Sequence, residues 1–290
     1  ATVLTGQCLM FGAETTPLAA ISHALRDLVT RFGPNRVAQW AGAGADALAT
    51  IVPALGGGTA EVGRMQQFEA VAAVLEGAAG EHPVILVVED LHWADAATAH
   101  LLQFLSSVLS AQAPVLILVS YRSDELTGPH PLRSALAELQ RRPRVHRVGL
   151  DPMAAHEIVE LIEPLHTMSS DAIARVVERS EGVPYFAEEL AACGAVGTLP
   201  STLREALLVR VRQLSPATQR LLQVAAVAGN RFTAELLSAV TGDPDPSDEL
   251  REAVAATVLV PVDGAFAFRH ALLTEVMTSE LLPGEAKRLH

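Results

Sequence analysis

Lysine is nearly missing from this 290-residue sequence. Lys287 is the single one, and arginine supplies the rest of the 21 Lys and Arg side chains. The 33 acidic residues outnumber these basic ones, which gives a formal net charge of −12. A protein that binds duplex DNA directly usually carries a basic stripe on its surface. The charge therefore argues against direct DNA contact by this sequence.

Cysteines, aromatic residues and long apolar runs are also scarce. The two cysteines, Cys8 and Cys193, are too few for a disulfide framework and lack C-x-x-C spacing, which favours a reducing, cytoplasmic environment. No run approaches the ~18 to 20 consecutive apolar residues of a membrane-spanning helix, and no signal-peptide pattern opens the sequence. With 50% hydrophobic and 19% charged residues, the composition is typical of a globular protein. At about 150 residues per domain, the length predicts roughly two domains.

Short apolar runs separated by amphipathic segments fill the first half of the sequence. VILVV after Pro83 and VLILVS after Pro114 show no alternation, which is typical of strands buried on both faces of a parallel sheet. Shorter runs predict strands at 2–4 and 145–150. Strands separated by helices favour an α/β fold with a parallel sheet over residues 1–150. Helical spacing predicts the intervening helices at 17–32, 37–55, 65–75, 95–109 and 131–139.

Helical spacing dominates after Asp151. Near the end, residues 258–262 and 265–268 read as a β-hairpin joined by Asp263-Gly264, and a last helix is expected from His270. Several helices closed by a hairpin and one more helix are the order of a winged helix. The other helices are predicted at 153–164, 170–181, 184–194, 201–213, 216–229, 233–241 and 247–257.

Charged side chains follow two of the predicted strands. Glu89 and Asp90 end one strand and Arg122 ends the next, so all three are expected at the ligand-binding edge of an open α/β sheet. Adjacent carboxylates there can hold Mg²⁺ and orient an attacking water, and an arginine can contact a terminal phosphate. Alternatively, the carboxylates cap the following turn, and Arg122 pairs with Asp124 or Glu125 on the surface. The residues alone leave both interpretations open.

Five segments of the sequence resemble, in the same order and spacing, the nucleotide-binding core of the signal-transduction ATPases with numerous domains (STAND). They are ILVVEDLHWAD, LILVSYRSDEL, EGVPYFAEEL, LPSTLREALLVRVRQLSPATQRLLQVAAVAG and FAFRHALLTEVMTSELLPGEAKRLH. More narrowly, they resemble large ATP-binding regulators of the LuxR family, which have relatives fused to cyclase domains. The resemblance implies a P-loop NTPase-type sheet over 1–150, a helical lid over 151–198 and a winged helix over 199–290.

The resemblance also implies roles for particular residues. Glu89 and Asp90 match the Walker B carboxylates that hold Mg²⁺ and position water; many relatives place Asp first, so which residue does which stays open. Arg122 matches the sensor 1 position. Gly182-Val183-Pro184 matches a turn whose proline packs on the adenine, and His270 matches a histidine that reaches the ADP β-phosphate.

Plainer interpretations stand beside these roles. Proline often begins a helix, which would account for Pro184, and a histidine at a helix start is commonly a cap or surface residue. His92 and Trp93 are expected in packing and in a turn, Asp95 as a helix cap, and the two cysteines as small core residues.

The phosphate-binding loop G-x-x-x-x-G-K-[ST] is missing, because the single lysine lies near the end of the sequence. The glycine-rich stretches 42–46 and 56–64 lack a lysine and a preceding strand, and we expect loops there. In the family, the first strand, the P-loop and its helix lie just upstream of the matching segment. The resemblance therefore implies that Ala1 begins the second core strand.

The leading hypothesis is an ATP/ADP-binding regulatory switch of a bacterial LuxR-type transcriptional regulator, with Mg²⁺ as the metal and slow or no hydrolysis. It would be cytoplasmic, respond to an unknown inducer, be able to self-associate, and contact DNA only through a helix-turn-helix outside this sequence. Two alternatives remain: the same module fused to a cyclase or kinase domain, and a nucleotide-free scaffold that has lost the P-loop.

Overall fold

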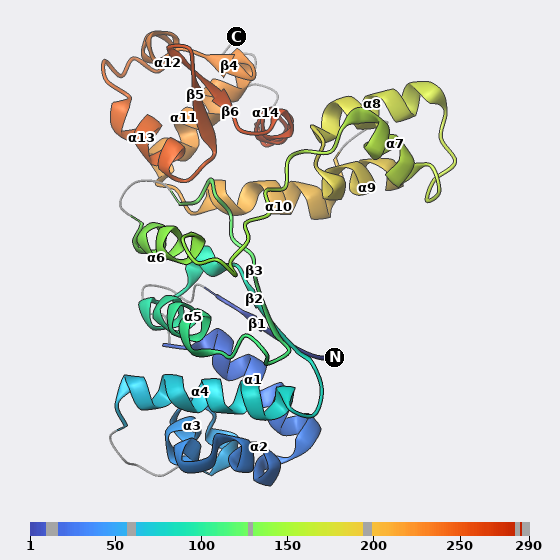
Figure 1. Ribbon diagram of the computed structural model, residues 1–290. Helices are drawn as coiled ribbons and strands as arrows, with labels where there is room; N and C mark the ends of the chain where they lie inside the picture. Colours follow the sequence, from blue (N-terminus) through green and yellow to red (C-terminus); the bar gives the residue numbers. More distant parts are fainter. Residues whose placement is uncertain (10–16, 57–61, 127–129, 194–198, 282–284, 286–290) are drawn as a thin grey trace. The chain divides into compact units, whose positions relative to one another are not determined.

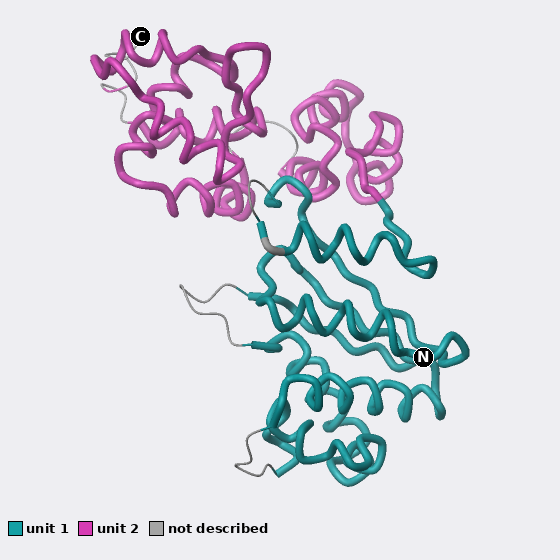
Figure 2. The backbone as a smooth tube through the Cα atoms, turned by 60° about the vertical axis from the view of Figure 1, so that its left-hand side comes forward, with its two compact units in different colours: residues 1–148 teal, residues 149–290 magenta. Residues whose placement is uncertain are grey.

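The computed structural model describes residues 1–9, 17–56, 62–126, 130–193, 199–281 and 285 (Figure 1). The chain divides into two compact units, residues 1–148 and 149–290 (Figure 2). The first unit contains β1 (Thr2–Gln7), α1 (Ala19–Phe32), α2 (Pro34–Ala41), α3 (Ala45–Ile51), α4 (Arg64–Ala79), β2 (Val84–Glu89), α5 (Ala96–Val108), β3 (Val115–Val119) and α6 (Pro131–Gln140).

A three-stranded parallel sheet, in the order β1-β2-β3, forms the centre of the first unit. The predicted α/β class is confirmed for this unit. β2 lies in the middle, with Leu4 opposite Leu86 and Leu86 opposite Ile117. Because all three strands run the same way, their carboxyl ends meet at one edge of the sheet. This edge carries the residues that the sequence analysis singled out on the first unit.

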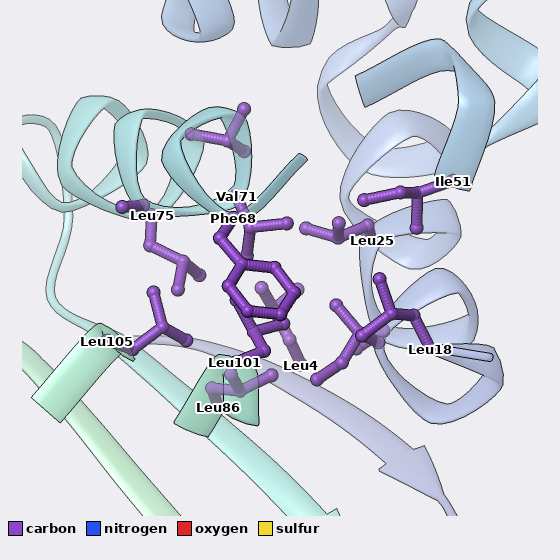
Figure 3. Close-up of a cluster of buried hydrophobic side chains, with 14 of the residues drawn as sticks. Leu4, Leu18, Leu25, Ile51, Phe68, Val71, Leu75, Leu86, Leu101 and Leu105 are labelled. Carbon is purple, nitrogen blue, oxygen red and sulfur yellow. The ribbon is translucent and has the colours of Figure 1, made fainter. Parts of the chain in front are cut away.

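One face of the sheet is covered by α1, α4 and α5, and the core of the unit lies there (Figure 3). Leu4, Leu86 and Leu101 are each at most 1% exposed. Burying one such side chain stabilises the fold by about 1.5–3 kcal/mol. The other members at the centre of this cluster include Leu25, Phe68, Val71, Leu75 and Leu105.

The opposite face of the sheet is apolar and partly open. Val3, Ile85 and Leu116 are aligned across the three strands, and Leu118 follows on β3. Leu116 and Leu118 are 56% and 55% exposed. Parallel sheets are normally covered on both faces. Among the described residues β3 pairs with β2 alone, so its outer edge also offers unpaired backbone groups.

Three predictions for the first unit are wrong. The stretch 42–46 is no loop, because Gly42–Gly44 form a 3-10 helix that runs into α3 and packs Gly44 closely against Ala70 of α4. Most of the other glycine-rich stretch, 56–64, lies outside the described residues. Residues 145–150, all described, form no strand, and Val148 and Leu150 are 79% and 93% exposed. No strand among the described residues pairs with this segment, and a strand is stable only when it is paired and packed. The helix expected over 37–55 is split into α2 and α3, because Gly42 takes a positive φ of 55° between them.

The second unit is mostly helical, and every helix predicted for it is confirmed to within three residues at each end. Its small sheet is antiparallel in the order β4-β6-β5; the β5–β6 hairpin was predicted, but the two-residue β4 was not. Its elements are α7 (Ala155–Ile162), α8 (Ser170–Ser180), α9 (Pro184–Ala192), α10 (Ser201–Arg212), α11 (Pro216–Ala228), β4 (Arg231–Phe232), α12 (Ala234–Thr241), α13 (Ser247–Ala255), β5 (Leu259–Val262), β6 (Ala265–Phe268) and α14 (Ala271–Ser279).

The second unit has a core of its own, built from both its early and its late helices. Ile158 of α7, Val176 of α8, Leu222 of α11 and Val276 of α14 are fully buried in one cluster. Within the described residues, no helix is both long and apolar enough to span a membrane.

We expect the 290-residue chain to self-associate through its open sheet face. Burial of exposed leucines is favourable, and the free edge of β3 can pair with another chain. Replacing Leu116 and Leu118 together by lysine should raise the monomer fraction in size-exclusion chromatography with light scattering. Leu165→Lys is the matched control, since Leu165 is also 56% exposed but lies outside this sheet. A wild-type chain that remains monomeric at high concentration would contradict the expectation.

Candidate functional site

The carboxyl edge of the parallel sheet brings three of the predicted residues together on the first unit. Glu89 ends β2 and lies opposite Gln7, the last residue of β1. Asp90 follows directly, and Arg122 comes three residues after the end of β3. Glu89 and Arg122 are exposed, whereas Asp90 is partly buried. The strand ends therefore place both carboxylates and the arginine at one edge, as their positions in the sequence predicted.

Asp90 is held in position by both neighbouring strands. Gln7 Nε2 donates a hydrogen bond to Asp90 Oδ2 at 3.0 Å, and the Asp90 N–H donates to Ser120 Oγ at 3.2 Å. The Asp90 backbone lies in the left-handed region, with φ 55° and ψ 42°, a conformation that Asp tolerates better than most residues. Together these features fix the direction of the Asp90 carboxylate.

Gln7 and Ser120 are contributors that the sequence analysis did not propose for this site. Each lies at or just after the end of a strand that flanks β2, and each contacts Asp90. The signal was present in the sequence, because polar residues at the carboxyl ends of neighbouring parallel strands meet at one edge. The edge of the sheet thus carries two further polar side chains, both of which support Asp90.

Arg122 also satisfies the plainer interpretation. Its Nη1 lies 3.5 Å from Glu125 Oε1, and the Arg122 side chain is 58% exposed. The Glu125 side chain is only 19% exposed, but water screens the exposed guanidinium, and a solvent-screened ion pair stabilises a protein by about 0–1 kcal/mol. The pairing is therefore weak enough for the guanidinium to exchange Glu125 for another anion.

His92 lies beneath this edge and is buried. Its Nδ1 accepts a hydrogen bond from the Arg122 N–H at 3.4 Å, and its Nε2 lies 3.2 Å from Glu125 Oε2 without hydrogen-bond alignment. Burial lowers the pKa of His92, and the nearby Glu125 carboxylate opposes that effect. The ring packs against Trp93, with the ring centroids 4.7 Å apart. Both residues therefore serve packing and the turn, as predicted.

Asp95 is the helix cap that the sequence predicted, and it joins two helices. Its Oδ1 accepts from the N–H groups of Ala97 and Thr98 at the start of α5, at 2.8 and 3.0 Å. Its Oδ2 accepts from the Leu18 N–H, just before α1, at 3.1 Å. One carboxylate thus fixes the beginnings of two of the helices that cover the sheet.

The two carboxylates are better suited to a magnesium ion that binds together with a ligand than to a metal ion held by the protein alone. Among the described residues there is no group of three or more His, Cys, Asp or Glu side chains that could hold a metal ion. Mg²⁺ is usually bound through one or two carboxylates together with phosphates and water. Glu89 and Asp90 supply that number of oxygen donors at the edge of the sheet.

Gly182 and Pro184, the other predicted turn residues, lie in the second unit. Gly182 has a φ of 75°, and a Cβ at this position would meet Met153 O at 2.6 Å. The Gly182 carbonyl also accepts from the Met153 N–H at 2.9 Å. Pro184 is the first residue of α9, which is a favoured position for proline. Glycine is therefore required here by both the backbone conformation and the close approach.

His270 precedes α14 and contacts Glu181 rather than capping its own helix. Its Nδ1 lies 3.2 Å from Glu181 Oε2, and its ring meets Phe186 edge-on, with centroids 5.2 Å apart. Burial lowers the pKa of His270, and the hydrogen bond that the ring donates to Glu181 partly opposes this. His270 therefore lies in the second unit with Gly182 and Pro184, and the two sets of predicted residues are each described within their own unit.

The two cysteines differ from each other. Cys8 is 5% exposed beside the sheet, as predicted. Its pKa is raised to about 12, first by burial and then by the carboxylates of Asp95 and Asp90. Cys193 is exposed, so the prediction that it is a small core residue is wrong. It lies at the end of α9, where the apolar face of the helix has already ended.

Comparison with known proteins supports an ATPase architecture. The family model described as "AAA ATPase domain" matches residues 1–118. The Walker-type ATPase PABY2304 of Pyrococcus abyssi aligns with 95% of this chain and 84% of its own at 13% identity, with a TM-score of 0.58. At that identity the likeness shows the fold alone. The first 118 residues are thus similar to an AAA ATPase domain.

The chain is also similar in sequence to one part of a longer protein. The "Uncharacterized protein R02095" of Rhizobium meliloti (strain 1021) is 29% identical over 252 residues, which cover 78% of this chain. The match spans 23% of the length of that protein. The STAND protein PH0952 of Pyrococcus horikoshii, which has a tetratricopeptide repeat sensor, aligns with 76% of this chain and 31% of its own at 15% identity. The TM-score of that alignment is 0.32.

The difference between the cysteines leads to a labelling prediction. With iodoacetamide at mildly alkaline pH, we expect alkylation of Cys193 and protection of Cys8, because the thiolate is the reacting form. The raised pKa lowers the thiolate fraction of Cys8 by roughly a thousandfold relative to a free cysteine. Peptide mass spectrometry reads both sites. The Cys193→Ser variant should react only after unfolding, and rapid alkylation of Cys8 in that folded variant would contradict the expectation.

Proposed function

We propose that this chain is the nucleotide-dependent switch module of a STAND-type ATPase in a LuxR-type transcriptional regulator. The observation that carries the proposal is the carboxylate pair Glu89–Asp90 at the end of the central strand. Gln7 and Ser120 support Asp90 from the strands on either side. The match of residues 1–118 to the AAA ATPase domain agrees with this assignment.

In the proposed site, Glu89 and Asp90 would hold Mg²⁺ and orient the attacking water. The ion, brought by the nucleotide, would neutralise charge on the phosphates. Gln7 keeps the Asp90 carboxylate aimed at the edge of the sheet, while the exposed Glu89 is free to turn toward a water or the ion. The conformation of Asp90, fixed by its backbone and both neighbours, favours it as the ligand whose position is set before the nucleotide arrives.

Arg122 is proposed as the residue that detects the terminal phosphate. Its present partner, Glu125, is a partly buried carboxylate at 3.5 Å. A phosphate carries more negative charge and can bind both arms of the guanidinium. When Arg122 exchanges the Glu125 carboxylate for a phosphate, the segment after β3 would lose one contact and gain another. Its contacts would therefore depend on whether the terminal phosphate is present.

The predicted residues of the second unit are proposed to contact a nucleotide as well. The turn at Gly182 and Pro184 would pack on the adenine, and His270 would contact the ADP β-phosphate. In this scheme residues 151–198 are a helical lid, and residues 199–290 are a winged helix built on α10–α14. Its function is regulatory, because a switch needs different affinities for two states rather than rapid turnover.

The phosphate-binding loop would come from outside this sequence, since the sequence contains no G-x-x-x-x-G-K-[ST]. The inducer, the contact with DNA and the output domain are likewise proposals that concern the whole protein, and a cyclase or kinase output would use the same switch.

We expect the 290-residue chain to bind ATP·Mg²⁺ very weakly or not at all. It lacks the backbone cradle and the lysine that hold phosphates in P-loop proteins. Isothermal titration calorimetry measures this directly. An affinity in the micromolar range would mean that the described residues form a complete nucleotide site and that the proposed division of the site is wrong.

His270→Ala should release ADP faster in a chain that carries both this sequence and a P-loop segment. A charge-assisted hydrogen bond to a phosphate is worth about 1.5–3 kcal/mol, which corresponds to roughly ten- to 150-fold in ADP retention. Stopped-flow displacement of a fluorescent ADP analogue measures the dissociation rate. His156→Ala is the matched control, because His156 is an exposed histidine on α7 of the same unit. An unchanged dissociation rate in His270→Ala would reject the assigned role.

A further inference from the structure

Glu181 connects the end of α8 to the start of α14. It follows the last residue of α8 and takes the left-handed conformation, with φ 51° and ψ 30°. Glycine is the usual residue at such a position, because a side chain makes the conformation unfavourable. In this chain glycine comes one residue later, at Gly182. Glu181 nevertheless occupies this backbone conformation, and its side chain contacts the start of α14.

Both oxygens of the Glu181 carboxylate are used at α14. Oε1 accepts a hydrogen bond from the Ala271 N–H at 2.9 Å, and Oε2 lies 3.2 Å from Nδ1 of His270. The start of α14 is thereby capped from another segment of the chain. The same carboxylate that caps the helix also contacts the histidine that precedes it.

The contact fixes which nitrogen of His270 carries a proton. An ionised carboxylate only accepts hydrogen bonds, so Nδ1–H is the donor. In the neutral ring, Nε2 then carries a lone pair. Within the part of the chain that the structure describes, Nε2 has no hydrogen-bond partner, and Phe186 packs edge-on against the ring. The ring is therefore held by one nitrogen and by a neighbouring aromatic face, while the other nitrogen remains available.

We infer that Glu181 is the positioning residue of His270, so that an anionic phosphate or pyrophosphate group binds at Nε2 only with uptake of one proton. The lone pair of the neutral ring would repel a phosphate oxygen, whereas the imidazolium donates through Nε2–H. The proton comes from solvent and stays on the ring. This inference rests on the proposed contact between His270 and a nucleotide phosphate, and it adds the protonation state that the contact needs.

The other charges around His270 act in different directions. Arg269, on the same turn, and Arg210, from α10, disfavour the imidazolium, as burial does, whereas Glu181 favours it. A second ion pair joins the same two helices: Arg179 Nη2 of α8 donates to both carboxylate oxygens of Glu275 on α14, at 3.0 and 2.8 Å. Because burial lowers the pKa of His270, the ring is mainly neutral at neutral pH, and a bound anion must shift that balance.

Glu181→Gln removes the charge but keeps an oxygen that can accept from the Ala271 N–H. Glu275→Gln is the matched control, because it weakens the other contact between α8 and α14 without touching His270. Two-dimensional ¹⁵N–¹H NMR of the ligand-free 290-residue chain reports the tautomer and pKa of each histidine, and His270→Gln assigns the signal. We expect the Nδ1–H tautomer in the wild type, a lower His270 pKa in Glu181→Gln, and wild-type behaviour in Glu275→Gln.

Inorganic pyrophosphate is the probe for the anion. The gain in its affinity over the His270→Gln variant, which cancels the titration of pyrophosphate itself, should fall about tenfold for each pH unit above the pKa of His270, since the His270 contact takes up one proton per anion bound. The pH at which the affinity begins to fall should be lower in Glu181→Gln, in step with the NMR titration. This pH dependence distinguishes a positioning role of Glu181 from a purely structural one, because a general loss of structure would lower the affinity for pyrophosphate at every pH.

Three results would overturn the inference: an Nε2–H tautomer in the wild type, the same His270 pKa in Glu181→Gln and Glu275→Gln, or pyrophosphate binding at His270 that does not depend on pH. The proposed nucleotide contact fails by a different result, an unchanged ADP dissociation rate in His270→Ala. The NMR measurement on the ligand-free chain tests the role of Glu181 independently of the ADP dissociation rate.

Discussion

The parallel pairing of β2 with β1 and β3 is the constraint on which the first unit depends. It aligns Gln7 with Glu89 and brings the segment after β3 within reach of Asp90, so that residues about 30 and 80 positions apart share one edge. The same pairing separates the faces of the sheet. Leu4 and Leu86 meet α1, α4 and α5, while Leu116 and Leu118 face the open side.

Much of this arrangement could be predicted from the sequence because it depends on local patterns. The unbroken apolar runs gave β2 and β3, and the helical spacing and caps gave the helices of the second unit nearly to the residue. Asp95 was predicted as a cap because its chemistry suits that position. The strand expected at 145–150 failed because pairing is decided by neighbours in space, and nothing in a local pattern reveals whether a neighbouring strand is present.

The candidate site was predictable in its residue types but not in its contacts. Position at a strand end was enough to single out Glu89, Asp90 and Arg122. The supporting contacts of Gln7 and Ser120, and the pairing of Glu181 with His270, join positions 30 to 89 residues apart. Such pairs follow from strand register and helix packing, which a single sequence does not display. The exposure of Cys193 is of the same kind, because it depends on where α9 ends.

The shared carboxylate of Asp95 has a mechanical consequence. It lies five residues after Asp90, and it holds the beginnings of both α5 and α1. A displacement of the segment between Asp90 and Asp95 would pull on both helices through one rigid connection. A change at the edge of the sheet would then move the beginnings of α5 and α1 together rather than separately.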